Sequence, residues 1–170
     1  LPTLVEENLI TADPQSICNK FSEYFKSTYS SQVPKLDVED IFKKSPLCYT
    51  NNIGIELLTL EEVQTCLLNI NPNKAAGPDN IPPGVIAALA EGLAKPLHFI
   101  FNLCIEEGKF PQYFKLTRVI PIHKSDSKTD VRNYRPISIL STFAKIFESL
   151  IHKNLLDSIK SRVSTRQHGF

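Results

Sequence analysis

The sequence predicts an α+β fold that is rich in helix and contains one small antiparallel β-hairpin. In several segments apolar residues recur every three or four positions, which is the spacing of one face of a helix. The stretch 117–140 instead has two short apolar runs, TRVIPI and PISIL, on either side of a polar segment rich in Ser, Asp, Lys and Thr. That pattern is typical of a hairpin. Several helices combined with one hairpin indicate the α+β class.

The first predicted helix spans Pro14–Ser30. Asp13 can cap its N-terminus, and proline is favoured at the first helical position. Apolar residues then recur every four positions, at Ile17, Phe21, Phe25 and Tyr29. We interpret this stripe as a packing surface. The following segment, 31–54, has a mixed composition with two prolines and is interpreted as a loop or linker.

A second helix is predicted to begin at Thr59, because Glu62 three residues later completes a capping-box pattern. One face of this helix carries Val63, Leu67 and Ile70. The Asn-Pro-Asn cluster at 71–73 is expected to end it.

The segment KAAGPDNIPPG, residues 74–84, has the composition of a loop, and its two prolines can open the next helix. Gly77 before Pro78 allows a tight bend, and Asp79 can cap the following turn. Lys74 fits two interpretations equally well. It is either a solvated loop residue or a contact to a nucleic-acid backbone.

Two further helices are predicted after this loop, one on each side of Pro96, and Gly108 is a fitting residue to end the second. The first has its apolar face at Val85, Ile86, Leu89 and Leu93. The second has its apolar face at Leu97, Ile100, Phe101, Cys104 and Ile105. The last helix, about Thr142–Lys160, is capped by Ser141 or Thr142, and its broad apolar stripe is interpreted as core.

The hairpin carries two candidate functional cations. Lys124 ends its first apolar run and Arg135 opens the second, so antiparallel pairing would bring the two charges near each other. An anion between them would relieve the repulsion, and a phosphate suits the planar fork of arginine and the compact charge of lysine. The alternative is that both are solvated charges that protect a strand edge. Asp126 and Asp130, in the polar segment, are interpreted as turn formers and not as metal ligands.

The composition is ordinary for a globular protein, with 170 residues, 42% of them hydrophobic and 22% charged. No run of about 18 apolar residues predicts a transmembrane helix, and the N-terminal segment lacks the pattern of a secretory signal. The four cysteines are widely separated and form no Cys-x-x-Cys pattern, so we expect a reducing compartment. The expected location is intracellular, in cytoplasm and nucleus. Because the chain begins with Leu1 and contains no Met, we expect it to be a piece of a longer polypeptide.

The net charge of +1 hides an asymmetry along the chain. Residues 1–108 carry 7 Lys and Arg against 14 Asp and Glu, whereas residues 109–170 carry 12 against 4. The first part therefore has a charge of −7 and the second a charge of +8. A basic C-terminal part favours a surface that binds nucleic acid. The alternative is that the two parts neutralise each other within the fold.

Four blocks of the sequence carry a family resemblance. They are KAAGPDNIP, FPQYFKLTRVIPIHK, NYRPISILSTFAKIFESLIHKNL and QHGF, between about Thr59 and Phe170. In this order and spacing they resemble the fingers region of reverse transcriptases from non-LTR (LINE-type) retrotransposons. The first block departs from the KAPGPDGIP of that family at Ala76 and Asn80, and the last has His168 where an aromatic residue is common.

The resemblance implies the helix-rich fingers portion of a right-hand polymerase, with residues 1–58 as a preceding linker and N-terminal helix, and residues 59–170 as the N-terminal part of the polymerase domain. The packing partner of the 14–30 helix would then lie outside the chain. The implied partners are an RNA template, a DNA primer, a dNTP and the rest of the polymerase, its palm and thumb. The catalytic Mg²⁺ of the family is held by aspartates of later motifs, none of which occurs here, so we expect no catalytic residue and no metal ligand in this chain.

By the same resemblance, Lys124 and Arg135 match the cations of the fingers that contact the triphosphate of the incoming nucleotide. Weaker candidates for contacts to the template backbone are Lys74, Lys115, Arg118 and Arg132. Two alternatives stand beside this function. The chain is either a non-catalytic RNA-binding module, which needs only the basic surface, or a remnant of a mobile element without function.

Overall fold

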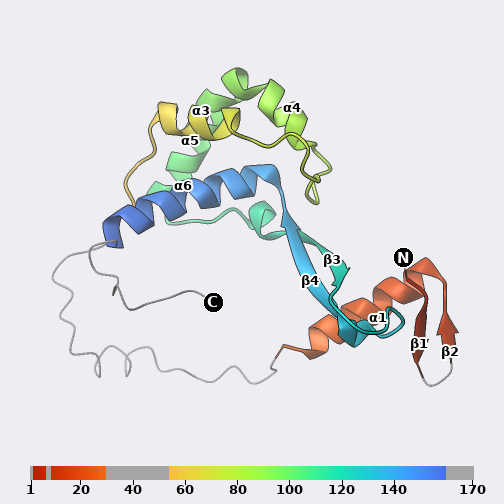
Figure 1. The fold of residues 1–170 in the computed structure, drawn as a ribbon. Helices are drawn as coiled ribbons and strands as arrows, with labels where there is room; N and C mark the ends of the chain where they lie inside the picture. Colours follow the sequence, from red (N-terminus) through yellow and green to blue (C-terminus); the bar gives the residue numbers. More distant parts are fainter. Residues whose placement is uncertain (1, 7–8, 30–53, 160–170) are drawn as a thin grey trace, which may run out of the picture. The chain divides into compact units, whose positions relative to one another are not determined.

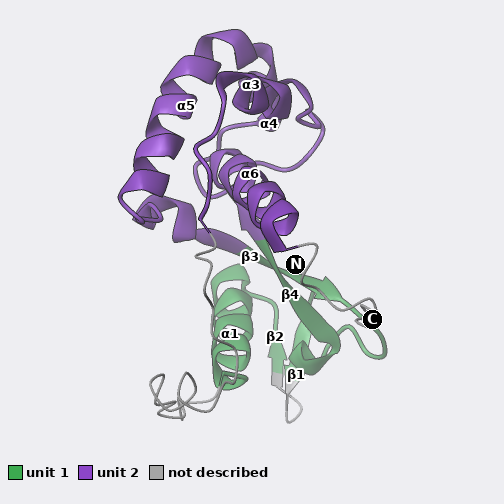
Figure 2. Cartoon of the chain, turned by 90° about the vertical axis from the view of Figure 1, so that its left-hand side faces the viewer, with its two compact units in different colours: residues 1–49, 119–138 green, residues 50–118, 139–170 purple. Residues whose placement is uncertain are grey.

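The computed structural model describes residues 2–6, 9–29 and 54–159 (Figure 1). The chain forms two compact units, each described by itself below (Figure 2). Unit 1 consists of residues 1–49 and 119–138, and unit 2 of residues 50–118 and 139–170. The predicted loop at 31–54 lies outside the described residues except for Gly54. The predicted division at residues 58 and 59 follows the family resemblance, not contacts, and remains a prediction.

In unit 1, helix α1 spans Pro14–Ser27. It begins as predicted, because the Asp13 carboxylate accepts a hydrogen bond of 2.8 Å from the Ser16 backbone N–H. Both the hydroxyl and the backbone N–H of Ser16 bind this carboxylate and lower the pKa of Asp13. The helix ends before Tyr29, whose side chain is 77% exposed. The predicted apolar stripe is therefore shorter than expected and stops at Phe25.

Two short strands that the sequence analysis did not predict precede this helix. Strand β1 spans Leu4–Glu6 and β2 spans Leu9–Thr11, and they pair antiparallel with Leu4 opposite Thr11. The Val5 backbone N–H donates to the Thr129 carbonyl at 2.9 Å. That hydrogen bond ties β1 to a turn far away in the sequence.

The predicted hairpin is present. Strand β3 spans Thr117–His123, β4 spans Tyr134–Leu140, and the 3₁₀ helix η2, Val131–Asn133, lies in the turn between them. The two strands form a two-stranded sheet, so both are edge strands, which is the position that accommodates Pro121. The unit boundary falls within both strands.

The core of unit 1 is small and lies between α1, β1 and the start of β4. Its buried residues are Leu4, Ile17, Phe21 and Tyr134. The rings of Phe21 and Tyr134 meet edge to face with centroids 4.9 Å apart, a favourable aromatic geometry. The expectation that the α1 stripe packs on a partner outside the chain was wrong, because the hairpin supplies that partner.

Unit 2 is helical. Its elements are α3 (Leu60–Leu68), α4 (Pro83–Ala88), α5 (Ala90–Glu106), the 3₁₀ helix η1 (Gln112–Lys115) and α6 (Thr142–Ile159). The capping box predicted at α3 is present, with Thr59 and Glu62 each bonding the backbone N–H of the other. Ser141 caps α6, because its Oγ accepts a hydrogen bond of 3.1 Å from the Ala144 N–H.

The C-terminus of α5 also ends as predicted, at Gly108. This glycine has φ +60°, and its N–H donates to the Ile105 carbonyl, while the Lys109 N–H donates to the Cys104 carbonyl. These two bonds make a Schellman motif, which glycine favours because it adopts the left-handed conformation without strain.

The helix boundary predicted at Pro96 was wrong. The break falls at Leu89 instead, and α5 continues through Pro96. Proline within a helix removes one backbone hydrogen bond. Burial outweighs this cost, because the buried residues on both sides of it follow one helix face: Ala90, Ala94, Leu97 and Phe101. With the break at Leu89, that residue and Val85 are exposed and not part of the predicted apolar face.

The core of unit 2 is one cluster drawn from α3, α4, α5 and α6. Its largest fully buried side chain is Phe101, which stacks on Phe147 at 4.9 Å and meets Phe114 edge to face at 6.4 Å. Cys66 and Cys104 pack against the cluster, Cys104 as predicted from its place on an apolar helix face, and burial raises the pKa of both thiols. None of the described helices is both long and apolar enough to cross a membrane. The α+β class is confirmed, and its assignment to polymerase fingers remains a prediction.

Candidate functional site

The register of the hairpin places the two predicted cations. The Lys124 backbone N–H donates to the Asn133 carbonyl at 2.8 Å, and the rings of His123 and Tyr134 meet at 5.3 Å. These contacts make His123 the cross-strand partner of Tyr134. Because side chains alternate along a strand, Ile122 and Arg135 lie on the opposite face of the ribbon from these two rings. Lys124 follows directly after the end of β3 at His123, at the same end of the hairpin as Arg135.

This second face of the hairpin is exposed and combines cations with aliphatic side chains. Lys124 and Arg135 are both exposed, and neither has an ion-pair partner within the described part of the chain. In the same register Ile122 lies opposite Arg135, and Ile137 follows it on the same face. We call this surface, made of Ile122, Lys124, Arg135 and Ile137, the cationic hairpin face.

The turn that joins the strands is held by its own hydrogen bonds. The His123 ring nitrogen Nε2 lies 3.1 Å from the Asp126 carbonyl, and Asp126 has φ +61°. The Tyr134 hydroxyl donates to the Lys128 carbonyl at 2.8 Å. The turn roles predicted for Asp126 and Asp130 are confirmed. His123 is not a free strand residue, because its ring packs on Tyr134 and bonds the turn.

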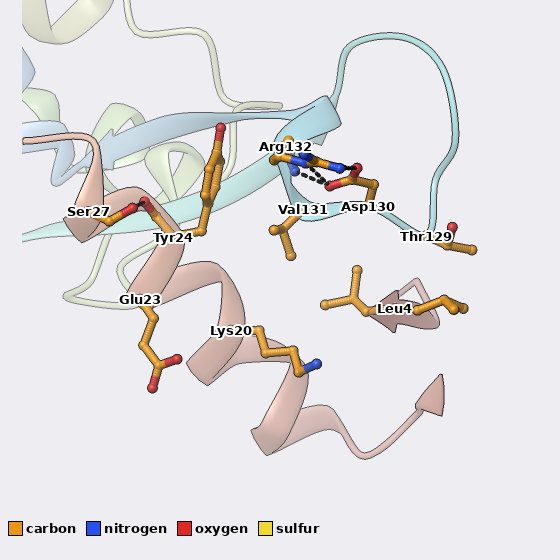
Figure 3. A pocket seen from close by; sticks show the side chains of 10 residues that line it. Leu4, Lys20, Glu23, Tyr24, Ser27, Thr129, Asp130, Val131 and Arg132 are labelled. Carbon is orange, nitrogen blue, oxygen red and sulfur yellow. Dashed lines mark hydrogen bonds and ion pairs between the residues drawn. The ribbon is translucent and has the colours of Figure 1, made fainter. Parts of the chain in front are cut away.

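Arg132, predicted to contact a template, is bound to a neighbour. Its guanidinium donates to both carboxylate oxygens of Asp130, with Nη2–Oδ2 at 2.6 Å, and these bonds lower the pKa of Asp130. Figure 3 shows this pair at the wall of a groove that Lys20 and Tyr24 of α1 also line. A contact from Arg132 to nucleic acid would therefore compete with Asp130 for the same donors.

In unit 2, Arg118 is joined to the predicted KAAGPDN loop. Its Nη2 donates to the Asn80 side-chain oxygen at 2.6 Å. Asn80 has φ +58°, a conformation that asparagine tolerates better than most residues. The Asp79 carboxylate accepts from the Ile81 N–H at 3.2 Å, which confirms its predicted turn role. The bond between Arg118 and Asn80 was not predicted, since nothing local in the sequence connects the two residues.

Gly77 occupies a position in this loop where no side chain fits. A Cβ there would lie 2.6 Å from the Leu140 carbonyl oxygen and from backbone atoms of Ser141. The loop therefore passes directly against the junction of β4 and α6. The predicted bend follows directly after it, at Pro78 and Asp79, where the Asn80 N–H donates to the Gly77 carbonyl at 3.2 Å. The close contact with the backbone, and not the bend, is what requires glycine here.

The two remaining predicted cations also lie in unit 2. Lys115 is exposed at the end of η1. Lys74 lines a groove together with Lys145 and Thr142 from the start of α6. Sequence analysis missed Lys145 as a candidate. The available signal was a cation in the first turns of a predicted helix, where the helix dipole disfavours positive charge.

Comparison with known proteins tests the family resemblance. The chain is 30% identical over 160 residues to an RNA-directed DNA polymerase from the mobile element jockey of Drosophila melanogaster. It is 33% identical over 116 residues to the corresponding polymerase of jockey from Drosophila funebris, and 30% identical over 110 residues to a probable RNA-directed DNA polymerase from transposon X-element of Drosophila melanogaster. The chain is related to the RNA-directed DNA polymerases of non-LTR retrotransposons. These alignments cover 92%, 66% and 64% of the chain, and the recognition made from the sequence is confirmed.

The chain spans only a small part of these retrotransposon polymerases, 15%, 13% and 12% of their respective lengths. No protein-family model matches the chain. The Asn80 position is the one where the related KAPGPDGIP block has glycine, and its positive φ is a physical reason for that preference. Asparagine keeps the conformation and adds the acceptor that Arg118 uses.

The described residues do not fit the metal centre that a polymerase would need. Among them, no group of three or more His, Cys, Asp or Glu side chains could hold a metal ion. Asp126 and Asp130 bond their own turn, and Asp130 is paired with Arg132. No step of the chemistry is therefore assigned to a metal held by these residues.

Proposed function

We propose that this chain forms the fingers portion of a retrotransposon RNA-directed DNA polymerase and binds the phosphates of the incoming nucleotide on the cationic hairpin face. The observation that supports this most strongly is the hairpin register, in which Lys124, directly after β3, and Arg135, the second residue of β4, lie at the same end of the ribbon and are both exposed. The relationship to retrotransposon polymerases supplies the enzyme class. In this proposal the reaction is addition of a dNTP to a DNA primer on an RNA template, inside a larger protein that includes palm and thumb.

The chemistry of the cationic hairpin face suits a triphosphate. The Arg135 guanidinium can donate two parallel hydrogen bonds to phosphate oxygens, and the Lys124 ammonium adds a compact charge. Together they neutralise negative charge and orient the β and γ phosphates, so their contribution is electrostatic and positional. Ile122 and Ile137 provide an apolar surface beside the two cations. Mg²⁺ and its carboxylate ligands would come from outside the described residues.

Contacts to the template are proposed for Lys74, Lys115 and Arg118, since basic side chains bind nucleic-acid backbones largely through charge. Arg118 is the best placed of the three, because Asn80 holds its guanidinium in one position. Arg132 is the weakest candidate, because Asp130 already binds it.

The test compares Arg135→Ala, Arg135→Lys and Lys124→Ala in the complete polymerase that contains this segment. Loss of a hydrogen bond to a charged group costs about 1.5–3 kcal/mol. Arg135→Ala is therefore expected to raise the KM for dNTP by about 10- to 100-fold, with a partial rescue by Arg135→Lys. Primer extension at varied dNTP concentration measures both KM and kcat.

Lys128→Ala is the matched control, because Lys128 is an exposed cation of the same turn whose backbone carbonyl, not its side chain, binds Tyr134. It should leave KM unchanged. An unchanged KM for Arg135→Ala would show that the cationic hairpin face does not bind the nucleotide.

A second candidate function is a non-catalytic RNA-binding module. It is favoured by the charge of +8 on residues 109–170. An RNA-binding module should bind RNA with an affinity that falls steeply as the salt concentration rises. In that case Arg135→Ala should not change the KM for dNTP. The same kinetic assay therefore separates the two functions.

A further inference from the structure

Helix α5 has a second row of mostly apolar residues, on the side away from the core of unit 2. In Figure 2 the helices α3, α4 and α6 all lie on the same side of α5, and the buried residues of α5 follow one face. At about 100° per residue, exposed residues at five positions are centred on the opposite side of the helix. We call these residues the outer stripe: Gly92, Pro96, Phe99, Leu103 and Glu106.

The outer stripe has the spacing of a seam between paired helices. Its members follow one another after four, three, four and three residues, and a repeat of about 3.5 residues keeps two helices in contact along their length. Its two largest side chains lie in solvent, since Phe99 is 68% and Leu103 is 41% exposed. The outer stripe therefore fits the apolar seam of another helix.

Gly92 is the member of the outer stripe that the chain itself does not explain. Glycine lowers the stability of a helix relative to alanine. Gly92 does not have a positive φ, and a Cβ there would meet no atom of the described residues within 4 Å. Nothing in the described part of the chain thus requires glycine at this position. The missing side chain leaves space on the surface for a side chain of another molecule.

The order of small and large residues indicates which helix fits. The small residues Gly92 and Pro96 come first along α5, and the large residues Phe99 and Leu103 follow. A second α5 in antiparallel orientation places Leu103 against Gly92 and Phe99 against Pro96. Two-fold symmetry makes each of these contacts twice. Parallel pairing would instead place large residues against large ones and glycine against glycine, so the outer stripe is complementary to itself only in the antiparallel orientation.

Charge favours the same orientation. Glu106 is the last residue of α5, where the helix dipole disfavours negative charge. Among the described residues no side chain caps the N-terminus of α5 at Leu89, which is the positive end of the dipole. With Leu103 against Gly92, Glu106 of one copy lies level with Leu89 of the other. Each carboxylate then lies beside the positive end of the partner helix, and Glu91, the acidic residue of that first turn, lies off the outer stripe.

We propose that two copies of this chain pair through their α5 helices, antiparallel, about a two-fold axis between Pro96 and Phe99. From Leu89 to Glu106 the seam is about 26 Å long, which is too short for an interface of about 800 Å² per partner. The dimer is therefore weak, with an expected Kd of about 10–100 µM. This pairing is independent of the proposed function, because no residue assigned to nucleotide or template belongs to the outer stripe.

Sedimentation equilibrium of the 170-residue chain, at concentrations between about 5 and 500 µM, brackets this Kd. Phe99→Ser should weaken dimerisation by about 10-fold or more, since two copies of an apolar contact are lost. Leu68→Ser is the matched control, because Leu68 is a 60% exposed residue of α3 and not of α5. It should change the Kd by less than about 2-fold.

Two results of this experiment would overturn the proposal. Equal losses for Phe99→Ser and Leu68→Ser would show that association follows exposed apolar surface in general. A chain that stays monomeric at about 500 µM would show that the outer stripe does not pair with a second copy, and would leave it to a helix outside this chain.

Gly92→Leu separates the specific contact from general adhesion between apolar surfaces. Leucine is the better helix former and a Cβ fits at this position, so Tm should rise by about 2–4 °C. The new side chain would occupy the space that Leu103 of the other copy takes, so dimerisation should weaken by about 10-fold. Stronger association, as expected if the added apolar surface only makes the helix more adhesive, would overturn the proposal.

Glu106→Gln tests the orientation. In the antiparallel dimer it removes two favourable contacts with helix ends, so the Kd should rise by about 3-fold at low salt and by less at high salt. Tm of the chain at low concentration should stay within about 2 °C of the parent. Parallel pairing would bring the two Glu106 side chains together, and the substitution would then strengthen association. An unchanged or a lowered Kd at low salt would therefore overturn the antiparallel arrangement.

Discussion

The two units are stabilised in different ways. The core of unit 2 is one large cluster to which four helices contribute, with most of its buried residues on α5 and α6. Among the residues that the structure describes, the core of unit 1 has four buried residues from three segments, and single hydrogen bonds such as Val5 N–H to Thr129 hold those segments together. A small core gives a low local free energy of unfolding. The predicted nucleotide contacts therefore lie in the unit with the smaller core.

The strongest test of this comparison is Phe101→Ala. Phe101 is fully buried and contacts two other phenylalanine rings, so its removal should lower the free energy of unfolding of unit 2 by about 4 kcal/mol. Chemical denaturation measures this loss, and hydrogen exchange should show it in the amides of α3, α5 and α6. Phe99→Ala on the same helix is the control, because Phe99 is 68% exposed and should cost less than about 0.5 kcal/mol.

Phe21→Ala makes the equivalent change in unit 1. The expected cost is about 3 kcal/mol, because Phe21 is buried against Tyr134. Faster hydrogen exchange should appear in α1 and the hairpin turn while the α5 amides keep their protection. Tyr29→Ala, at an exposed position just after α1, should have no measurable effect. Loss of protection in both units at once would show that their cores unfold together.

Much of the helical structure in both units was predictable because its signals are local. The caps at Asp13, at Thr59 with Glu62, and at Gly108 fix helix ends through neighbours within a few residues. The local signal at Pro96 was misleading, because α5 continues through this residue. Burial of residues on both sides of Pro96 stabilises the continuous helix, and local helix propensity does not include such tertiary packing. For unit 1 the hairpin pattern was sufficient, but the strands β1 and β2 are too short to show a pattern.

The candidate site likewise has some features that could be predicted from the sequence and others that could not. That Lys124 and Arg135 lie at the same end of the hairpin follows from antiparallel pairing, which the two apolar runs predict. The pairs formed by Arg118 with Asn80 and by Arg132 with Asp130 depend on where side chains meet in space or on one rotamer among several. No spacing rule predicts them.

A smaller change, Tyr134→Phe, isolates one hydrogen bond of unit 1. The Tyr134 hydroxyl donates to the Lys128 carbonyl, and its loss should cost about 1 kcal/mol, with the ring packing on Phe21 retained. Hydrogen exchange of the turn amides measures the effect. Unchanged protection of these amides would show that the other hydrogen bonds of the turn are sufficient. Unit 1 would then depend less on single hydrogen bonds, and would differ less from unit 2, than the comparison above states.

The smallest expected effect comes from acid titration of the α3 cap in unit 2. The Thr59 N–H and Lys153 hold the pKa of Glu62 below its ordinary value of 4.5. A carboxyl whose folded pKa is lowered stabilises the fold above the unfolded pKa, and that contribution is lost as the pH falls through the folded pKa. Between pH 6 and pH 3 the parent should therefore lose slightly more of its free energy of unfolding than Glu62→Gln does. Denaturant midpoints at both pH values measure the difference, and identical pH dependence in the two proteins would contradict it.

The narrow space around Gly77 has a genetic consequence. Every glycine codon begins with two guanines, and a change of either base replaces glycine by a residue with a Cβ or by a stop. Because a Cβ would collide with the backbone at Leu140 and Ser141, every such mutation damages the junction of β4 and α6. A single-base change in either of the first two positions of codon 77 should therefore lower the stability of unit 2.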